Sequence, residues 1–495
     1  MANNHDRPDI LFFFSDQHHG LYAGYAGNPV VETPNLDRLA AEGTVFDNAY
    51  TPCPLCVPAR TAMLTGQLPT RTCVTGNGHF MASDQASFLH SLGAQGYETV
   101  LCGRMHFKGP DQRHGFTKRI FGDVLSAYGG VGDHGPCGQS YGMKGCMDIV
   151  GGGNSGVLEY DRNVIQAAQG YLEQDHEKPQ CIVVGLYGPH FPYIAPPELY
   201  DYYRDKVTAP ASWNPEGADP NPVIDAKRQR TRRAYELEGK EVDVTEDAML
   251  AARAAYYGMI THLDGQVGQV RDAWQTYLDR TRRGGVFLYS SDHGDTTGEH
   301  CIFGKQTFYE GSVRVPMIFA GDGVRAGQRL NGLASLLDIS PTLCDIAGAS
   351  PPPDQDGCSL MPGLENGDCD TERGVLSEWV QNWKGDLVAG RMLRKGKWKL
   401  MRYRHPDAPD QLFDIENDPD ELQNCAAANP GVVAALAQEL ESGWDLERVL
   451  ATLRNTQEHL NLIGNWFHAS DFEEPEHWPI PDCAQKPPAT GLSAK

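Results

Sequence analysis

The sequence predicts an α/β protein built around a mainly parallel β-sheet. Two observations support this fold class. Short, strongly apolar runs alternate along the chain with segments of helical periodicity, and four of these runs end directly on polar side chains. With 495 residues the chain is long enough to bury a large core and to form two domains. We expect a main domain at residues 1–370 and a smaller C-terminal domain at residues 371–495.

Each predicted strand of the main domain leads into side chains that bind metals or exchange protons. The strands are expected at residues 10–14, 99–102, 181–187 and 286–289. They are followed, in that order, by Asp16-Gln17, Arg104-Met105-His106, Gly188-Pro189-His190 and Asp292-His293. Because open α/β sheets bind ligands at the carboxyl ends of their strands, these four segments are expected to meet in one crevice.

The C-terminal domain is predicted from apolar runs at residues 387–404 and 411–415, which suggest strands, and from a helical segment at about residues 432–446. Three consecutive prolines, Pro351 to Pro353, and the acidic stretch after them predict a linker between the domains. The glycine-rich residues 123–156 predict loops that shape a pocket or lie at the surface, and the polar tail after Trp478 predicts a draped or disordered end.

Composition limits the classes of partner. The formal net charge of -23 disfavours nucleic acid and anionic membranes, and it requires any anion-binding site to supply its own cations. Residues 1–9 are polar, and the apolar run at 10–14 is too short for a signal sequence or a membrane span. Thirteen scattered cysteines fit reduced thiols better than a disulfide framework. We therefore expect a cytoplasmic protein.

The most specific motif of the chain is Cys56-Val57-Pro58-Ala59-Arg60, extended by Leu64-Thr65-Gly66. Cys56 alone is compatible with a buried structural cysteine or, together with Cys53, with a redox pair. The extended motif resembles the signature of the type I, formylglycine-dependent sulfatases of the alkaline phosphatase superfamily, and the resemblance extends from residue 8 to about residue 424. In that family a maturating enzyme converts the cysteine to formylglycine, so the same modification is expected of Cys56.

The resemblance implies an alkaline-phosphatase-like fold, with a large mixed, mainly parallel sheet between helices and a four-stranded antiparallel sheet in the C-terminal domain. It also implies an enzyme that hydrolyses a sulfate ester to an alcohol and inorganic sulfate. The negative charge of the chain favours a small organic or carbohydrate sulfate over a heavily sulfated polymer. Pro58 places residue 56 at a helix N-terminus, where the helix dipole favours an anionic nucleophile.

Two residue pairs predict a metal site. Asp16-Gln17 and Asp292-His293 supply two carboxylates, an amide oxygen and an imidazole, which suit one divalent cation. In the family the matching positions, with the modified cysteine, bind Ca²⁺, so the expected ligands are Asp16, Gln17, Cys56, Asp292 and His293. Many members have Asp where Gln17 stands and Asn where His293 stands. The imidazole of His293 is also compatible with Mn²⁺ or Mg²⁺ at this site.

The resemblance also implies roles for the cationic side chains. Arg104 stands where lysine is usual in the family, and with Lys305 it is expected to bind the sulfate oxygens. Arg60 is expected to stabilise the nucleophilic alkoxide. His190, with Lys305, is expected to contact the substrate and protonate the departing alcohol. His106 is expected to deprotonate the second hydroxyl of the formylglycine hydrate, so that sulfate is released.

Three other functions compete with a sulfatase. A phosphonate monoester or phosphodiester hydrolase of the same superfamily uses the same formylglycine, and such enzymes resemble this chain through their Asp-Gln and Asp-His pairs. A non-catalytic metal-binding protein would lack a site residue, whereas every expected role is filled here. A thiol redox protein would need both Cys53 and Cys56 as thiols.

Two further segments, residues 109–116 and 308–316, resemble the choline-sulfatase-like branch of the family, although the usual C-terminal tail of that branch is not recognisable. The substrate therefore stays open among aryl, sugar and choline-like sulfate esters. The sequence does not decide whether the protein forms a homo-oligomer. Four aromatic side chains near the C-terminus are expected either in the core, which is the default, or in a subunit interface. They are Trp444, Trp466, Phe467 and Trp478.

Overall fold

The computed structural model describes residues 7–131, 146–213, 220–232, 235–237, 240–242, 244–383, 386–470, 473–474 and 477–478. Residues 132–145 of the predicted glycine-rich loops and the predicted tail after residue 478 lie outside the described residues.

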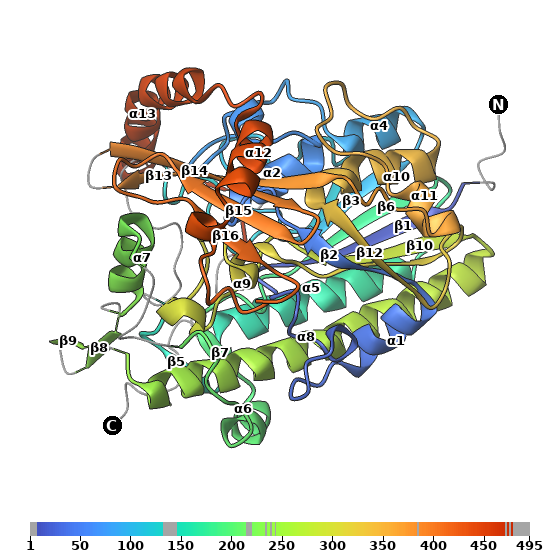
Figure 1. The fold of residues 1–495 in the computed structure, drawn as a ribbon. Helices are drawn as coiled ribbons and strands as arrows, with labels where there is room; N and C mark the ends of the chain where they lie inside the picture. The colour runs from blue at the N-terminus through green and yellow to red at the C-terminus, as the bar shows by residue number, and fades with distance from the viewer. Residues whose placement is uncertain are drawn as a thin grey trace.

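A mixed sheet of eight strands forms the centre of the molecule (Figure 1). Among the described strands of this sheet, β11 alone runs antiparallel to both of its neighbours, and the other adjacent pairs are parallel. The predicted large, mainly parallel sheet is therefore confirmed. The spatial order of the strands is β12 (Gln328–Ser335), β2 (Thr44–Tyr50), β11 (Met317–Gly321), β10 (Gly285–Ser291), β1 (Asp9–Ser15), β6 (Gln180–Gly185), β3 (Glu98–Gly103) and β4 (Lys118–Phe121).

The four strands predicted for the main domain are the four neighbours at the centre of this sheet, β10, β1, β6 and β3. The side chains of β1 point alternately to two apolar layers: Phe12 and Phe14 pack on one face of the sheet, and Leu11 and Phe13 on the other. Strands buried on both faces appear in a sequence as continuous apolar runs, which is why these four were predictable. The run predicted to residue 187 ends as a strand at Gly185.

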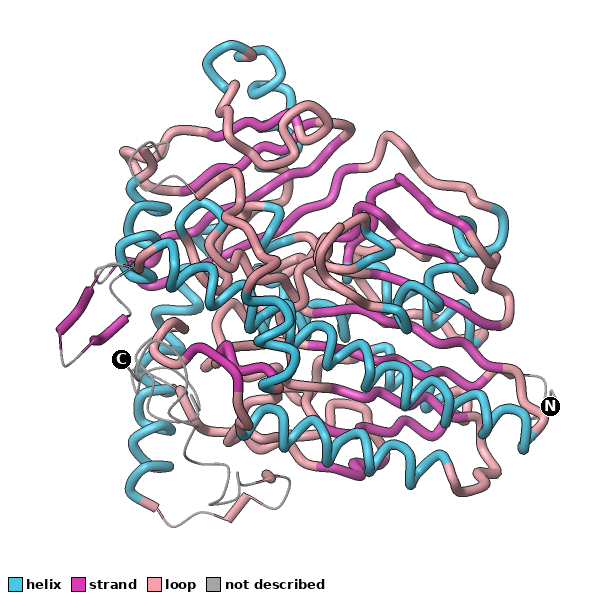
Figure 2. The backbone as a smooth tube through the Cα atoms, turned by 90° about the horizontal axis from the view of Figure 1, so that it is seen from below, coloured by secondary structure: helices cyan, strands magenta, loops and turns pink. Residues whose placement is uncertain are grey.

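Helices cover both faces of the sheet (Figures 1 and 2). The face of Phe13 is covered by α1 (Pro34–Glu42), α5 (Gly156–Leu172) and α8 (Glu246–Thr281). The face of Phe12 is covered by α2 (Cys56–Thr65), α4 (Phe88–Ala94), α10 (Ile339–Ala347) and α11 (Met361–Asn366). The long helix α8 begins where the side chain of Thr245 accepts a hydrogen bond from the backbone N–H of Ala248.

Shorter elements fill the connections between these layers. They are α3 (Pro69–Thr72), β5 (Val150–Gly152), β7 (Tyr193–Ala195), α6 (Pro197–Arg204), α7 (Pro222–Arg232), β8 (Tyr235–Leu237), β9 (Lys240–Val242) and α9 (Glu310–Val313). No helix in the described part of the chain is both long enough and apolar enough to cross a lipid bilayer.

A separate antiparallel sheet of four strands follows, as expected from the family resemblance. It contains β13 (Gly374–Trp383), β14 (Asp386–Lys395), β15 (Trp398–Tyr403) and β16 (Gln411–Asp414) in this order. The apolar run predicted at residues 387–404 is two strands, because Gly396 turns the chain with a positive φ of 53°. The domain boundary predicted between residues 370 and 371 stays a prediction.

The C-terminal helices differ from the predicted one. The helix expected at residues 432–446 is α12 (Pro430–Glu441), which ends before Gly443, where φ is 65°. A second helix, α13 (Leu446–Ala469), follows and was not predicted. Of the four C-terminal aromatic residues, Trp444 is buried in the core of this domain, whereas 44% of Trp466 is exposed.

The predicted linker is not a free connection. The side-chain amide of Gln355 donates a hydrogen bond to the carbonyl oxygen of Thr65 at 2.7 Å. The backbone N–H of Asp356 donates to the carbonyl oxygen of Gly66 at 2.8 Å, and its carboxylate accepts from the backbone N–H of Leu68 at 2.8 Å. The segment therefore closes the C-terminal end of α2, the helix that begins at Cys56.

Candidate active site

The carboxyl ends of β10, β1, β6 and β3 lie side by side, because these strands are parallel neighbours. The polar segments that follow them are therefore brought to one edge of the sheet, and the predicted crevice is confirmed as a place where they meet. The contacts below join Asp16, Arg104 and Asp292 to one another through Arg60 of α2.

Cys56 is the first residue of α2, and only 1% of it is exposed. Its Sγ lies 3.2 Å from Nε2 of His293, 3.0 Å from Nζ of Lys305 and 3.7 Å from Oδ1 of Asp16. The predicted position at a helix N-terminus is confirmed. Because the first N–H groups of a helix have no partner inside the helix, this position favours a negatively charged atom on residue 56.

Four buried side chains form a cluster that fits a metal ion. One ligand atom from each of Asp16, Cys56, Asp292 and His293 lies within 4.8 Å of the others. The Nδ1 atom of His293 donates a hydrogen bond to the carbonyl oxygen of Gly294 at 3.1 Å, so its Nε2 lone pair faces the cluster. Burial lowers the pKa of His293 to about 4, so its ring is neutral at pH 7 and can bind a cation.

Gln17 lies beside this cluster in a left-handed backbone conformation, with φ of 73°. Its Oε1 accepts a hydrogen bond from Nζ of Lys305 at 2.8 Å, and its Nε2 donates to the carboxylate of Asp295. Its backbone carbonyl oxygen accepts from the hydroxyl of Tyr256 at 2.5 Å. Asp295 and Tyr256 were missed by the sequence analysis, because neither stands in a recognisable motif.

Two buried arginines neutralise the carboxylates. Nε of Arg60 donates to Asp292 at 2.9 Å, and its Nη2 donates to Asp16 at 3.1 Å. Nε of Arg104 donates to Asp16 at 2.8 Å. Burial opposes ionisation of Asp16, but Arg104, Lys305 and Arg60 together hold its pKa well below the usual range. The carboxylate of Asp16 is therefore ionised and available as a ligand.

His106 is fixed by its neighbours. Its backbone N–H donates to Asp123 at 2.8 Å, and its Nδ1 lies 2.8 Å from Nη2 of Arg104. A guanidinium only donates hydrogen bonds, so Nδ1 accepts and the proton of the neutral ring is on Nε2. Burial, Arg104 and Lys108 lower the pKa of His106 well below its usual value. Nε2 is buried and has no hydrogen-bond partner among the described residues, which leaves it for a ligand.

Asp123 was also missed by the sequence analysis, which assigned it only to a glycine-rich loop. Its carboxylate holds the backbone N–H of His106, lies 3.5 Å from Nη1 of Arg104 and accepts from the backbone N–H of Leu125 at 3.1 Å. A lone acidic residue in a loop gives no signal of such a position, because the contact depends on the pairing of β3 with β4.

His190 and Lys305 complete the group. Nδ1 of His190 donates to the carbonyl oxygen of Phe191 at 2.7 Å, and its ring interacts with the side chain of Cys56. Burial and the nearby Lys305 lower the pKa of His190. Lys305 is 7% exposed and stands over the ring of Phe191 at 5.8 Å. All of the predicted site residues therefore lie in one group, and their roles stay predictions.

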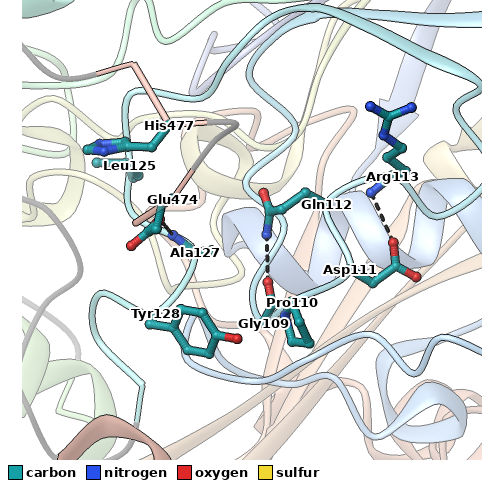
Figure 3. A pocket seen from close by; sticks show the side chains of 10 residues that line it. All are labelled: Gly109, Pro110, Asp111, Gln112, Arg113, Leu125, Ala127, Tyr128, Glu474 and His477. Atoms are coloured by element: carbon teal, nitrogen blue, oxygen red, sulfur yellow. Dashed lines mark hydrogen bonds between the residues drawn. The ribbon is translucent and has the colours of Figure 1, made fainter. Parts of the chain in front are cut away.

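A cavity of about 360 Å³ is lined by the segment that follows His106 and by the loop that follows Asp123 (Figure 3). Residues 109–113 line it from the first segment, and Leu125, Ala127 and Tyr128 line it from the second, together with Glu474 and His477. The carboxylate of Glu474 accepts hydrogen bonds from the hydroxyl of Ser126 at 2.6 Å and from the backbone N–H of Ala127 at 2.7 Å. The segment around Glu474 is thus attached to the loop that begins at Asp123.

Comparison with known proteins agrees with this site. Residues 8–349 match the family model described as sulfatase, and residues 298–445 match the model described as N-sulphoglucosamine sulphohydrolase, C-terminal. The chain is 34% identical over 504 residues to the choline-sulfatase of Rhizobium meliloti (strain 1021), covering 97% of this chain and 95% of that protein. It is 28% identical over 468 residues to the arylsulfatase K of Mus musculus, covering 90% and 81%.

Solved structures with a similar fold include the phosphonate monoester hydrolase of Agrobacterium radiobacter, with a TM-score of 0.71 and 22% identity, over 91% of this chain and 96% of that chain. A 2-O GAG sulfatase has a TM-score of 0.68 and 21% identity, over 94% and 95%. At these identities the likeness concerns the fold.

Proposed function

This chain belongs to the sulfatase family, a family of sulfuric ester hydrolases, and we propose that it hydrolyses a small organic or carbohydrate sulfate ester to an alcohol and inorganic sulfate. One observation carries the proposal. Cys56, at the start of the buried helix α2, has its sulfur beside His293, Lys305 and Asp16. These are the neighbours that a nucleophile at residue 56 needs in order to attack an anionic sulfur centre.

The family uses formylglycine and a metal ion, and the chain has residues suited to both. We propose that Cys56 is converted to formylglycine, whose hydrate supplies the nucleophilic hydroxyl. We also propose Asp16, Gln17, Asp292 and His293, with the converted residue, as the ligands of one divalent cation, Ca²⁺ first among the candidates. Such a cation would supply Lewis-acid stabilisation of negative charge on the nucleophile.

The cationic side chains then have separate proposed tasks. Arg60 holds the carboxylates of Asp16 and Asp292 in fixed positions. Lys305 and the N–H groups of Arg104 that have no partner among the described residues bind the sulfate oxygens. His190, protonated on Nε2 once the anionic substrate is bound, gives that proton to the leaving alcohol oxygen with the help of Lys305, while its Nδ1 keeps the hydrogen bond to Phe191.

His106 has a more restricted task in this arrangement. With its proton on Nε2, the neutral ring donates a hydrogen bond toward the reacting group and cannot accept a proton there. For His106 to act as the base that releases sulfate, Nε2 must lose this proton while Nδ1 gains one. That exchange requires the contact with Arg104 to open. We propose this opening as a step between attack and release.

The proposal is tested first by the mass of the tryptic peptide Leu39 to Arg60, from protein made in a host that forms formylglycine. We expect the peptide mass to be lowered by the exchange of thiol for aldehyde at residue 56. The variant Cys53→Ala leaves Cys56 in place, so its peptide should show the same loss of mass at residue 56. A panel of sulfate esters is then expected to release inorganic sulfate. An unmodified Cys56, in a host that converts a control sulfatase, would contradict the proposal.

A phosphonate monoester or phosphodiester hydrolase is the second candidate. It is favoured by the fold likeness to the phosphonate monoester hydrolase and by the Asp16-Gln17 and Asp292-His293 pairs. The ratio of kcat/KM for a sulfate monoester to that for a phosphate diester, measured on one converted preparation, separates the two. A sulfatase gives a ratio well above one.

We also propose that the protein works in the cytoplasm and that a formylglycine-generating enzyme is its partner during maturation. The buried thiols of Cys53, Cys102 and Cys181 form no disulfide, which fits a reducing compartment. Reaction of the purified protein with a thiol reagent in denaturant, without reductant, counts the free thiols. A count below twelve, which is the thirteen cysteines less the converted Cys56, would argue against this compartment.

A further inference from the structure

Helix α7 lies next to the site and is held by contacts to both parts of the chain. Asn221, the residue before the helix, donates a hydrogen bond from Nδ2 to Oε1 of Gln411 on β16 at 3.1 Å. Nε of Arg228 donates to the carbonyl oxygen of His300 at 3.1 Å. Val223 and Ile224 are buried against the core shared with the C-terminal sheet. In Figure 1, α7 is the green helix below β13. The side chains on its inner face therefore have fixed positions.

Lys227 extends from this inner face toward the site. Its Nζ donates a hydrogen bond to Oε1 of Gln306 at 3.2 Å. Gln306 follows Lys305, whose own Nζ is 3.0 Å from Sγ of Cys56, and the backbone N–H of Gln306 donates to the carbonyl oxygen of Pro54. Lys227 therefore contacts the residue next to Lys305, and Lys305 in turn contacts Cys56. The sequence analysis did not single it out.

No carboxylate of the described residues neutralises the charge of Lys227. In this part of the chain its ammonium forms no salt bridge, and its one hydrogen-bond partner is the neutral amide of Gln306. The nearest carboxylate on its own helix, Asp225, pairs with Arg228 at 2.9 Å. Asp295 accepts its hydrogen bonds from Gln17 and Tyr193. These acids are therefore engaged elsewhere.

The pKa of Lys227 reflects this lack of an anionic partner. Burial and Arg230 are the main causes that lower it to about 7, and Lys305 adds to the effect. An amine in such a position gains more than a surface lysine from a bound anion, because the anion restores the charge that the surroundings disfavour. The net charge of the chain is -23, so acidic side chains outnumber basic ones. A half-buried lysine without a carboxylate partner in the described part of the chain is therefore unusual for this protein.

We propose that Lys227 is a specificity-determining residue that binds a second oxyanion, a carboxylate or a second sulfate, on the alcohol part of the substrate. This inference rests on the proposed function and narrows it. In this proposal the reacting sulfate binds near Cys56 and Lys305, and the alcohol part extends from there toward Gln306 and Lys227. A substrate with a quaternary ammonium in this position would meet a like charge.

The proposal therefore predicts that choline sulfate is not the preferred substrate, although a choline-sulfatase is among the relatives of the chain. Three para-substituted phenyl sulfates separate the cases: one with a carboxylate, one with a neutral acetyl group and one with a trimethylammonium group. We expect kcat/KM to be highest for the carboxylate and lowest for the ammonium ester. Choline sulfate is measured beside them and is expected to follow the ammonium ester.

The test variant is Lys227→Met, which keeps the aliphatic stem and removes the charge. We expect it to lower kcat/KM for the carboxylate ester about tenfold, to leave the acetyl ester within about twofold and to improve the ammonium ester. Lys227→Arg is expected to keep the wild-type order. Lys206→Met removes the same charge from an exposed position after α6 and is the matched control, with all ratios within about twofold.

Binding measured by calorimetry in a Cys56→Ala background gives a second readout that does not need turnover. In this background Lys227→Met is expected to weaken binding of the carboxylate ester about tenfold and to leave the affinity for phenyl sulfate unchanged. Equal loss of both ligands, or no loss of either, overturns the inference. If this binding difference appears but no sulfate ester is hydrolysed by converted enzyme, the proposed function fails and the anion site at Lys227 stands.

Discussion

Nζ of Lys305 donates a hydrogen bond to Sγ of Cys56 across 3.0 Å. The same ammonium donates to Oε1 of Gln17 at 2.8 Å, and the nearest oxygen of Asp16 is 4.0 Å away. Lys305 therefore joins the position of the nucleophile to a proposed metal ligand, and its charge acts on the side chain of residue 56 more directly than on any carboxylate of the cluster.

Lys305→Met should lower kcat/KM for 4-nitrophenyl sulfate by about 10² to 10³, as the loss of one donor to a developing oxyanion does in other enzymes. Lys118→Met, at a side chain that is 48% exposed, is the control and should retain wild-type activity. The mass of the peptide Leu39 to Arg60 must show equal conversion in both variants. A fall of less than tenfold would refute a direct role for Lys305.

Arg104→Met tests the tautomer of His106. Methionine removes the positive charge and the contacts to Asp16, Asp123 and His106, so KM should rise about tenfold. Loss of the positive charge also removes a cause that lowers the pKa of His106. The acidic limb of kcat against pH should therefore move to higher pH, because a base with a higher pKa loses its proton later. An unmoved limb would show that His106 is not the titrating base.

Asp123→Asn should loosen both Arg104 and His106, because the new amide presents N–H groups where two donors now meet a carboxylate. We expect kcat to fall about tenfold while the melting temperature stays near that of the wild type. Glu474→Gln weakens the attachment of the same loop from outside the site and should give a smaller effect in the same direction. Glu473→Gln, one residue away, is its control and should leave kcat unchanged. A wild-type kcat in Asp123→Asn would rule out a positioning role.

Metal removal should lower stability as well as activity. A cation that binds only the folded chain stabilises it by about 2.7 kcal/mol when its concentration is one hundred times its dissociation constant. The melting temperature of chelator-treated protein should therefore rise with added Ca²⁺. Asp292→Asn should abolish this rise, whereas Asp272→Asn, at a side chain that is 73% exposed, should preserve it. If Mn²⁺ or Mg²⁺ restores activity and Ca²⁺ does not, the proposed ion is wrong.

Acid should destabilise the protein through its buried histidines. Burial lowers the pKa of His300 to about 3 and that of His18 to about 4. Between pH 6.5 and 4 the unfolded chain binds protons at these positions and the folded chain does not, so stability falls as pH falls. Each histidine should contribute a loss of about 2 kcal/mol between pH 6.5 and 5.

His300→Asn tests this effect at one position, because asparagine tolerates the positive φ of 51° found there. Urea unfolding at several pH values should give a shallower dependence for this variant than for the wild type. His459→Asn, at an exposed position of α13, is the control. Parallel curves for His300→Asn and the wild type would contradict the prediction.

The sequence was most informative where one segment carries both structure and chemistry. Asp16 and Asp292 follow apolar runs that have to be strands of a buried sheet, so their meeting could be inferred before any coordinates. Cys56 was placed by a motif whose proline and glycine mark the two ends of α2. In each case the local pattern and the final position agree.

Other parts of the site depend on contacts between distant residues. Asp295 accepts from Gln17 across 278 positions of the chain, and Gln411 holds Asn221 across 190. No sequence motif surrounds Lys227, because its proposed role depends on the packing of α7 against His300 and the C-terminal sheet. The edge strand β12 and its neighbour β2 were also missed, since they are partly exposed and lack a continuous apolar run.

The burial of Cys56 has a consequence for when the chain is modified. Its sulfur contacts His293 and Lys305, which lie 237 and 249 residues later. At a synthesis rate of about 5–20 residues per second, about 12 to 50 s pass between the appearance of Cys56 and that of Lys305. If Cys56 is converted as proposed, the converting enzyme has access to the thiol only before these residues cover it. The converted fraction should then depend on how fast β10 docks beside β1, so variants that slow or speed folding should change this fraction without altering a site residue.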